Sequence, residues 1–135
     1  MATPRELIDR ELKSAVVPVL RERGFKGTYP HFRRLSSGGV DLLTFQFDRN
    51  GGGFVKEIAR GSAEGFTTHW GKFIPSNKLT AWDLHPDNRH RLKPRESSGT
   101  DSWFRYENAR AADVANQVLE QLPKAEALWG KQVEV

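Results

Sequence analysis

The sequence contains no cysteine among its 135 residues. That absence excludes a disulfide framework, a thiolate nucleophile and a cysteine-ligated zinc site. Long apolar runs are also missing, because the longest, residues 15–20, is far too short to span a membrane. The N-terminus is charged from Arg5 onward and has no apolar stretch of the kind that a secretory signal needs. We therefore expect a cytoplasmic protein that does not enter a membrane.

Charge of one sign is in only slight excess. Lys and Arg total 21 and Asp and Glu total 17, for a net charge of +4, which is compatible with an anionic partner but identifies none. Large side chains are plentiful by comparison, since four Trp and eight Phe are spread along the chain and can fill a core. The length predicts one domain, residues 1–135.

An N-terminal helix is predicted over residues 4–23. Thr3 and Glu6 have the spacing of a capping box, and a proline follows Thr3 at the position where its missing N–H costs nothing. Apolar residues then recur at helical spacing, and Gly24 supplies a left-handed C-terminal cap. Pro18 lies inside this pattern and is expected to kink the helix or to begin a new turn.

The pattern changes after this helix to short strands separated by turn residues. Strands are predicted near residues 29–35, 40–48, 54–60, 89–93 and 102–107. In the second strand Leu43, Phe45 and Phe47 alternate with polar residues, which indicates a sheet with one buried face. Glycine-rich turns join the first three strands as an antiparallel meander.

A second helix is predicted over residues 109–129, with Asn108 as its cap and Pro123 as a kink or an end. The predicted fold class is therefore α+β: an antiparallel sheet of four to five strands with both helices packed on one face. Aromatic side chains are expected to form the core, namely Phe45, Phe47, Phe54, Trp70, Trp82 and Trp129. A pocket lined by Trp82, Trp103 and Arg91 is the alternative for part of this set.

The segment FDRNGGGFVKEI, residues 47–58, raises the question of a phosphate-binding loop. Such a loop needs a helix directly after the glycines, whose free N–H groups face the phosphates. Here a strand pattern follows, so a turn between two strands is predicted instead. Asp48 and Glu57 flank this turn and could approach each other as an acid–base pair, but two solvated carboxylates are the favoured interpretation.

Several short motifs together resemble the bacterial domain-of-unknown-function family numbered 4304. The first helix ends in Arg-Gly-Phe at residues 23–25, and Phe-Arg-Arg at residues 32–34 precedes LLTFQFDRNGGGF. Arg91 and Leu92 follow, and then Asp101, Trp103 and Phe104 form an Asp-x-Trp-Phe element before the last helix. The resemblance covers most of the chain and implies this fold, but it implies no catalytic residues.

A metal site is the next hypothesis. Asp83, His85, Asp87 and His90 lie within eight positions, and imidazole and carboxylate groups together can hold a divalent ion. The segment also contains Pro86 and lacks the helical spacing of a zinc protease motif, so an exposed turn is favoured. A metal-dependent hydrolase centred on Asp83, His85 and His90 is therefore the third-ranked function, and no cofactor is expected.

Nucleic-acid or phosphate binding ranks second. It would use basic residues on the predicted strands beside aromatic faces, a combination found in single-strand binders. The cations are Arg33, Arg34, Arg89, Arg91 and Lys93. No recognised nucleic-acid-binding motif accompanies them, and alternation places Arg89, Arg91 and Lys93 on the opposite face from His90 and Leu92.

The favoured function is a non-enzymatic binding or protein-interaction module. Arg91, Asp101 and Trp103 are the first candidates for its binding site, although Arg91 and Asp101 could instead pair across adjacent strands. A partner protein is the expected ligand class under this hypothesis, and the sequence does not identify it.

Overall fold

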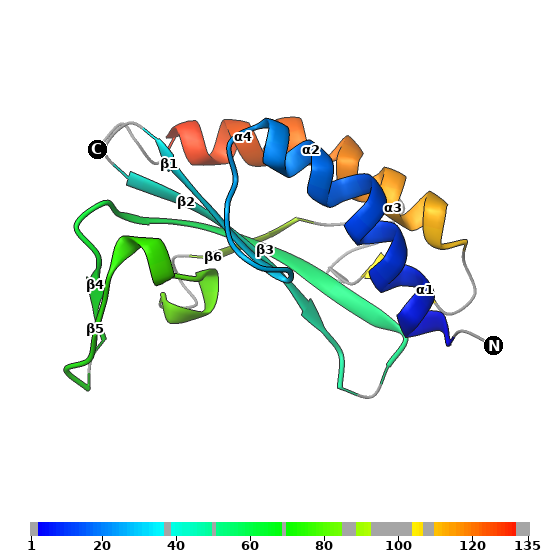
Figure 1. The fold of residues 1–135 in the computed structure, drawn as a ribbon, viewed down its shortest axis with the longest axis horizontal. Helices are drawn as coiled ribbons and strands as arrows, with labels where there is room; N and C mark the ends of the chain where they lie inside the picture. Colours follow the sequence, from blue (N-terminus) through cyan, green and yellow to red (C-terminus); the bar gives the residue numbers. More distant parts are fainter. Residues whose placement is uncertain are drawn as a thin grey trace.

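Four helices lie on one side of an antiparallel sheet, and a segment with two short 3-10 turns lies on the other (Figure 1). The structure, a computed structural model, describes residues 3–36, 39–49, 51–68, 70–84, 89–92, 104–106 and 110–131. The predicted fold class is confirmed. Within those ranges, no helix is long and apolar enough to cross a membrane.

The N-terminal helical region has three parts: α1 (Pro4–Glu11), a π-helical turn (Leu12–Val16) and α2 (Val17–Glu22). The predicted capping box is present, with Thr3 Oγ1 accepting from the Glu6 N–H at 3.1 Å and Glu6 Oε1 accepting from the Thr3 N–H at 3.2 Å. The wider π turn precedes Pro18, which therefore stands in the first turn of α2, where its missing N–H breaks no bond. Gly24 ends the region with a φ of 94°, as predicted.

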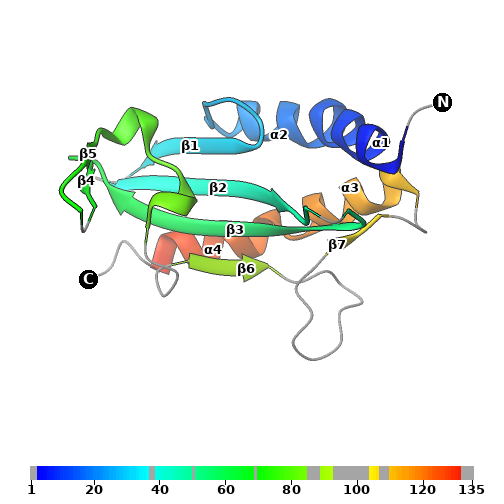
Figure 2. The ribbon, with the colours of Figure 1, turned by 90° about the horizontal axis from the view of Figure 1, so that it is seen from below.

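The main sheet contains β1 (His31–Ser36), β2 (Gly39–Phe47), β3 (Gly53–Ser62), β6 (Arg89–Leu92) and β7 (Phe104–Arg105). Its order is β1-β2-β3-β6, and β7 pairs with the start of β3 (Figure 2). All pairings are antiparallel. Two further strands that were not predicted as a pair, β4 (Phe66–Thr67) and β5 (Phe73–Ile74), form a separate hairpin.

The predicted C-terminal helix is divided into α3 (Ala111–Glu120) and α4 (Leu122–Lys131). The division falls at Gln121 rather than at Pro123, because Pro123 lies in the first turn of α4 and needs no hydrogen-bond partner there. Arg110 precedes the first turn of α3, and the predicted cap Asn108 lies outside the described residues. The pair packs beside the N-terminal region, where α3 contacts α1.

The main core lies between the helices and the sheet. Buried apolar residues from every helix meet the inward side chains of the strands, among them Leu12, Phe45, Phe54 and Val118. Phe54 and Phe104 stack with ring centroids 5.1 Å apart across the β3–β7 pair. Trp129 of α4 is buried and donates its indole N–H to the Ala59 carbonyl at 3.0 Å, which anchors the last helix to β3.

The second face of the sheet is also partly covered, which corrects the expectation of one buried face. The segment with η2 (Ser76–Lys78) and η3 (Ala81–Asp83) packs its apolar residues against this face. A smaller core results, in which Leu79 and Ala81 meet Leu42 and Ala59. Alternation along β2 therefore does not separate buried residues from exposed ones, because both faces of its first half are buried.

The aromatic core was predicted correctly in part. Phe45, Phe54 and Trp129 are buried and Phe47 packs at the margin. The prediction is wrong for Trp70 and Trp82, whose exposed fractions are 67% and 45%. Trp70 lies in the turn of the β4–β5 hairpin, away from the helix layer, and Trp82 lies on the outer face with its ring edge against His31.

The glycine-rich segment is a turn between β2 and β3, as predicted. Phe47 pairs with Phe54, the Asp48 N–H donates to the Gly53 carbonyl at 2.9 Å, and the Gly51 N–H donates to the Asp48 carbonyl at 2.9 Å. Gly51 and Gly52 have φ values of 88° and 86°, which disfavour any residue with a side chain. A strand rather than a helix follows, so the helix N-terminus that a phosphate loop requires is missing here.

Lys56 of β3 is buried in the main core without a carboxylate partner in the described chain. It lies on the helix-facing side of β3, between Phe54 and Ile58, and its ammonium donates to the Val118 carbonyl at 3.1 Å. That carbonyl is at the C-terminal end of α3, where a positive charge interacts favourably with the helix dipole. Burial nevertheless lowers the pKa of Lys56 from 10.5 to about 7.

Replacing Lys56 by methionine tests this buried charge. The unfolded chain retains a lysine pKa near 10.5, so between about pH 7 and pH 10.5 the unfolded state holds more protons than the folded state. As the pH rises through this range, the free energy of unfolding of the native protein should therefore increase relative to that of Lys56→Met by up to about 1.4 kcal/mol per pH unit. Urea unfolding of both proteins at pH 7 and pH 9 measures the difference, and a difference that stays constant would contradict the assignment.

Candidate functional site

Two rows of polar residues cross the sheet, each in direct strand register. The inner row, on the helix side, consists of Arg34, Asp41 and Arg60, which are paired across β1, β2 and β3. The outer row, on the opposite face, consists of His31, Thr44, Glu57 and Arg91, which are paired across β1, β2, β3 and β6. Residues directly opposite one another in a sheet contact each other, so each row forms a continuous polar contact.

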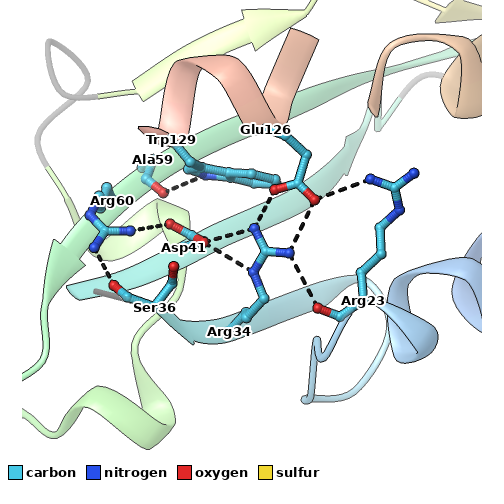
Figure 3. Close-up of polar contacts among 8 residues, drawn as sticks. All are labelled: Arg23, Arg34, Ser36, Asp41, Ala59, Arg60, Glu126 and Trp129. Atoms are coloured by element: carbon cyan, nitrogen blue, oxygen red, sulfur yellow. Dashed lines mark hydrogen bonds and ion pairs between the residues drawn. The ribbon is translucent and has the colours of Figure 1, made fainter. Parts of the chain in front are cut away.

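Asp41 is the centre of the inner row and is almost completely buried (Figure 3). Its Oδ2 accepts from Arg34 Nη2 at 2.9 Å and from Arg34 Nε at 3.1 Å, while its Oδ1 pairs with Arg60. Arg60 also donates to the Ser36 carbonyl, and its guanidinium lies where a side chain at Gly39 would be. The Asp41 carboxylate thus holds Arg34 and Arg60 in place and links β1, β2 and β3 through side chains.

Glu126 extends the inner row to α4 (Figure 3). It pairs with Arg34 and with Arg23, whose Nη1 lies 3.1 Å from Glu126 Oε2. The hydrogen bond to Glu126 raises the pKa of Arg34, and the same bond lowers the pKa of Glu126. A small recess of about 130 Å³ remains beside this network, lined by both acids and by Trp129. Every charged side chain that lines this recess is already paired with an opposite charge, so we interpret the recess as part of the structural network.

Glu57 is the buried centre of the outer row. Its Oε1 accepts from Arg91 Nε at 3.1 Å, and its Oε2 lies 3.4 Å from Arg89 Nη1. Arg89 also donates to the carbonyls of Trp82 and Leu84, which ties the 3-10 segment to β6. The favoured interpretation of Glu57 as a solvated carboxylate is therefore wrong. Its strand neighbours are Thr44 and Arg91, whereas the turn closes with Phe47 opposite Phe54, so Asp48 and Glu57 are not a cross-strand pair.

His31 ends the outer row at the sheet edge. Its Nδ1 lies 3.0 Å from Thr44 Oγ1, and its ring meets Trp82 edge-on at a centroid distance of 4.8 Å. Burial lowers the pKa of His31, the Arg33 charge lowers it further, and Asp83 opposes the shift. The imidazole is therefore neutral near pH 7 and serves as a hydrogen-bonding group.

A groove lies along the outer edge of β1 and includes two residues from the sequence prediction, Arg33 and Arg34. We call it the β1 groove; its volume is about 400 Å³. The lining residues are Gly24, Lys26, Arg33, Arg34, Leu35, Val40, Ser76 and Asn77. It therefore lies between the loop after α2, the β1 edge and the η2 turn.

Two cations in the β1 groove have no carboxylate partner in the described part of the chain: Lys26 and Arg33. Their backbones are fixed, because the Lys26 N–H donates to the Arg33 carbonyl at 2.7 Å and the Arg33 N–H donates to the Lys26 carbonyl at 2.8 Å. Arg33 Nε donates to the Leu79 carbonyl at 2.9 Å, which leaves its two terminal amino groups for a ligand. Partial burial lowers the pKa of Arg33.

The predicted binding residues that the structure describes lie at two separate places. Arg33 and Arg34 line the β1 groove, but Arg34 is paired with Asp41 and Glu126. Arg91 lies in the outer row and Arg89 next to it, both paired with Glu57, with Leu92 in the core on the other face as predicted. The remaining candidates, Lys93, Asp101 and Trp103, lie outside the described residues. Lys26 was not predicted, because a lone lysine between Phe25 and Gly27 carries no motif.

The proposed metal ligands have other roles where they are described. Asp83 Oδ2 caps η3, accepting from the Thr80 N–H at 2.8 Å and from the Thr80 hydroxyl at 3.2 Å. His90 is exposed on β6, while His85 and Asp87 lie outside the described residues. Among the side chains that the structure describes, no group of three or more potential ligands could hold a metal ion.

Replacing Asp41 by asparagine tests the inner row. The change leaves two arginines around a neutral group in a buried place, and removing one partner of a buried ion pair typically costs about 3–5 kcal/mol. Glu126→Gln is the matched control, because Glu126 belongs to the same network but is partly exposed, and it should cost about 1 kcal/mol or less. Urea unfolding measures both variants; equal costs would contradict the central role of Asp41.

The model of a known protein family covers most of the chain. The model of the domain of unknown function DUF4304 matches residues 16–131, which include the sheet, both polar rows and the C-terminal helices. A search of curated proteins and a search of solved structures each gave no match. The resemblance predicted from Arg23, Phe32 and the strand before the glycine turn is therefore confirmed, and the chain belongs to the DUF4304 family.

Proposed function

We propose that the protein is a binding module that holds an acidic segment of another protein in the β1 groove. The observation that carries this proposal is the pair of cations, Lys26 and Arg33, beside an apolar side chain, Leu35, whose exposed fraction is 70%. Carboxylates of a partner can pair with the cations, and an apolar residue of the same segment can cover Leu35.

The distribution of charge in the rest of the molecule supports this choice of site. Arg34 is bonded to Asp41 and Glu126, and Arg89 and Arg91 are bonded to Glu57. Asp83 influences Arg33 electrostatically, yet no ion pair joins these two described residues. A ligand carboxylate in the β1 groove would thus meet positive charge that the described chain has not already neutralised.

The groove also has a shape and composition that suit a polypeptide. Its volume of about 400 Å³ is large enough for a few side chains, and it combines Leu35 and Val40 with the polar Ser76 and Asn77. A nucleic-acid surface made of Arg33, Arg34, Arg89 and Arg91 has less support, because three of these four guanidinium groups are already paired with carboxylates. An acidic protein segment matches both the cations and the apolar part.

Binding to poly-L-glutamate tests the proposal with a probe of the right chemistry. The native protein should bind it in a way that weakens with added salt, and Lys26→Glu should weaken binding by about tenfold, since close charge pairs contribute roughly 1.5 kcal/mol or more. Arg33→Gln should act in the same direction while keeping a hydrogen-bonding side chain. Fluorescence anisotropy with labelled polymer measures the affinities.

The matched control is Lys124→Glu, which makes the same change of charge at an exposed position of α4, away from the groove. It should leave the affinity nearly unchanged. Equal losses for Lys26→Glu and Lys124→Glu would mean unspecific attraction and would overturn the site. A parallel titration with single-stranded oligothymidylate examines the competing ligand class: tighter binding there, lost in Lys26→Glu, would replace the acidic protein by a nucleic acid.

A further inference from the structure

The β4–β5 hairpin presents two large aromatic side chains to solvent. Trp70 lies in its turn and Phe73 on β5, and their exposed fractions are 67% and 57%. Thr68 and Lys72 are joined by two hydrogen bonds: the Thr68 N–H donates to the Lys72 carbonyl at 2.8 Å, and Thr68 Oγ1 accepts from the Lys72 N–H at 3.0 Å. The hairpin lies at one end of the molecule, beside the η2 and η3 segment (Figures 1 and 2).

A second groove of about 430 Å³ begins at this hairpin; we call it the hairpin groove. It is lined by Lys72, Phe73, Ile74, Pro75, Lys78, Thr80 and Asp83. Pro75 and Lys78 belong to the hairpin groove, while Ser76 and Asn77 between them line the β1 groove. The two grooves therefore lie on either side of one short turn.

The hairpin groove has the same charge character as the β1 groove. The ammonium groups of Lys72 and Lys78 pair with no carboxylate of the described chain. Asp83 is the acid among the lining residues, and its Oδ2 accepts two hydrogen bonds from Thr80. Uncompensated cations thus stand beside exposed aromatic rings, so the ammonium groups can attract carboxylates of a partner and the rings can supply apolar contact.

We propose that the hairpin groove is a second contact site for the acidic protein segment that occupies the β1 groove, and that it binds an aromatic residue of that segment against Trp70 and Phe73. This proposal rests on the proposed function. The segment would cross the turn at residues 75–78, with carboxylates near Lys26 and Arg33 on one side and near Lys72 and Lys78 on the other. Two weak contacts joined by one chain bind more tightly than either alone, because the second contact is then intramolecular.

Two labelled peptides of equal length and charge test this inference. One consists of glutamates with interspersed serines, and the other has phenylalanine in place of the serines. The native protein should bind the phenylalanine peptide about fivefold or more tightly than the serine peptide, and Trp70→Ala or Phe73→Ser should abolish that preference while leaving the serine peptide's affinity unchanged. Trp82→Ala is the matched control, since Trp82 is an exposed tryptophan that packs against His31 and does not belong to the hairpin, and it should retain the preference.

The two proposals fail in different ways in this experiment. If only the second contact site is wrong, both peptides bind equally and Lys26→Glu still weakens both. If the proposed function is wrong, neither peptide responds to Lys26→Glu. Oligothymidylate is the remaining probe: if it quenches the protein's tryptophan fluorescence in the native protein but not in Trp70→Ala, and the peptides show no preference, then the hairpin stacks bases and the peptide assignment is overturned.

Discussion

The carboxylate of Asp41 is the contact on which the arrangement of strands and helices depends. It is buried between Arg34 and Arg60 and so joins β1, β2 and β3 through side chains as well as through backbone hydrogen bonds. Arg34 then carries the connection to Glu126, which places α4 over the sheet. Because a buried charge without a partner is expensive, this network favours the observed register of the three strands.

The covering of both faces of the sheet decides where a ligand could bind. The helices cover one face, and the η2 and η3 segment covers part of the other with Leu79 and Ala81. Buried acidic residues on both faces, such as Asp41 and Glu57, already form ion pairs with arginines. The open volume therefore lies at the margins, along the β1 edge and beside the β4–β5 hairpin, where the covering segment ends.

Local signals in the sequence were sufficient for the two helical regions and for the meander of the first three strands. The capping box of Thr3 and Glu6, the cap at Gly24 and the turn before Phe54 each depend on a few adjacent residues, and each was predicted. The short strands at residues 66–67 and 73–74 were harder, because two residues carry no detectable alternation. Sequence comparison added the family but no site, since the DUF4304 description names no function.

The environment of individual side chains could not be predicted from local patterns. Glu57 and Lys56 are adjacent in sequence, yet one is buried with two arginines and the other is buried under α3 with only a carbonyl. Trp70 and Trp129 are the same type of residue, and both were predicted to lie in the core. Only Trp129 is buried there, because Trp70 belongs to the β4–β5 hairpin, which lies away from the helix layer. Such differences depend on contacts between residues far apart in the chain, for example the pairing of Glu57 with Arg91.

The pairing of charges explains why a nearly balanced protein can have grooves lined by cations that form no ion pair in the described chain. The net charge is only +4, but Asp41, Glu57 and Glu126 are held inside networks with arginines. Each of these acids neutralises guanidinium groups within the fold and contributes little to the field outside it. The lysines at the two grooves, Lys26, Lys72 and Lys78, form no ion pair with an acid of the described chain. The ion pairs of both rows thus use arginine, which fits the stronger and more directional hydrogen bonding of the guanidinium group.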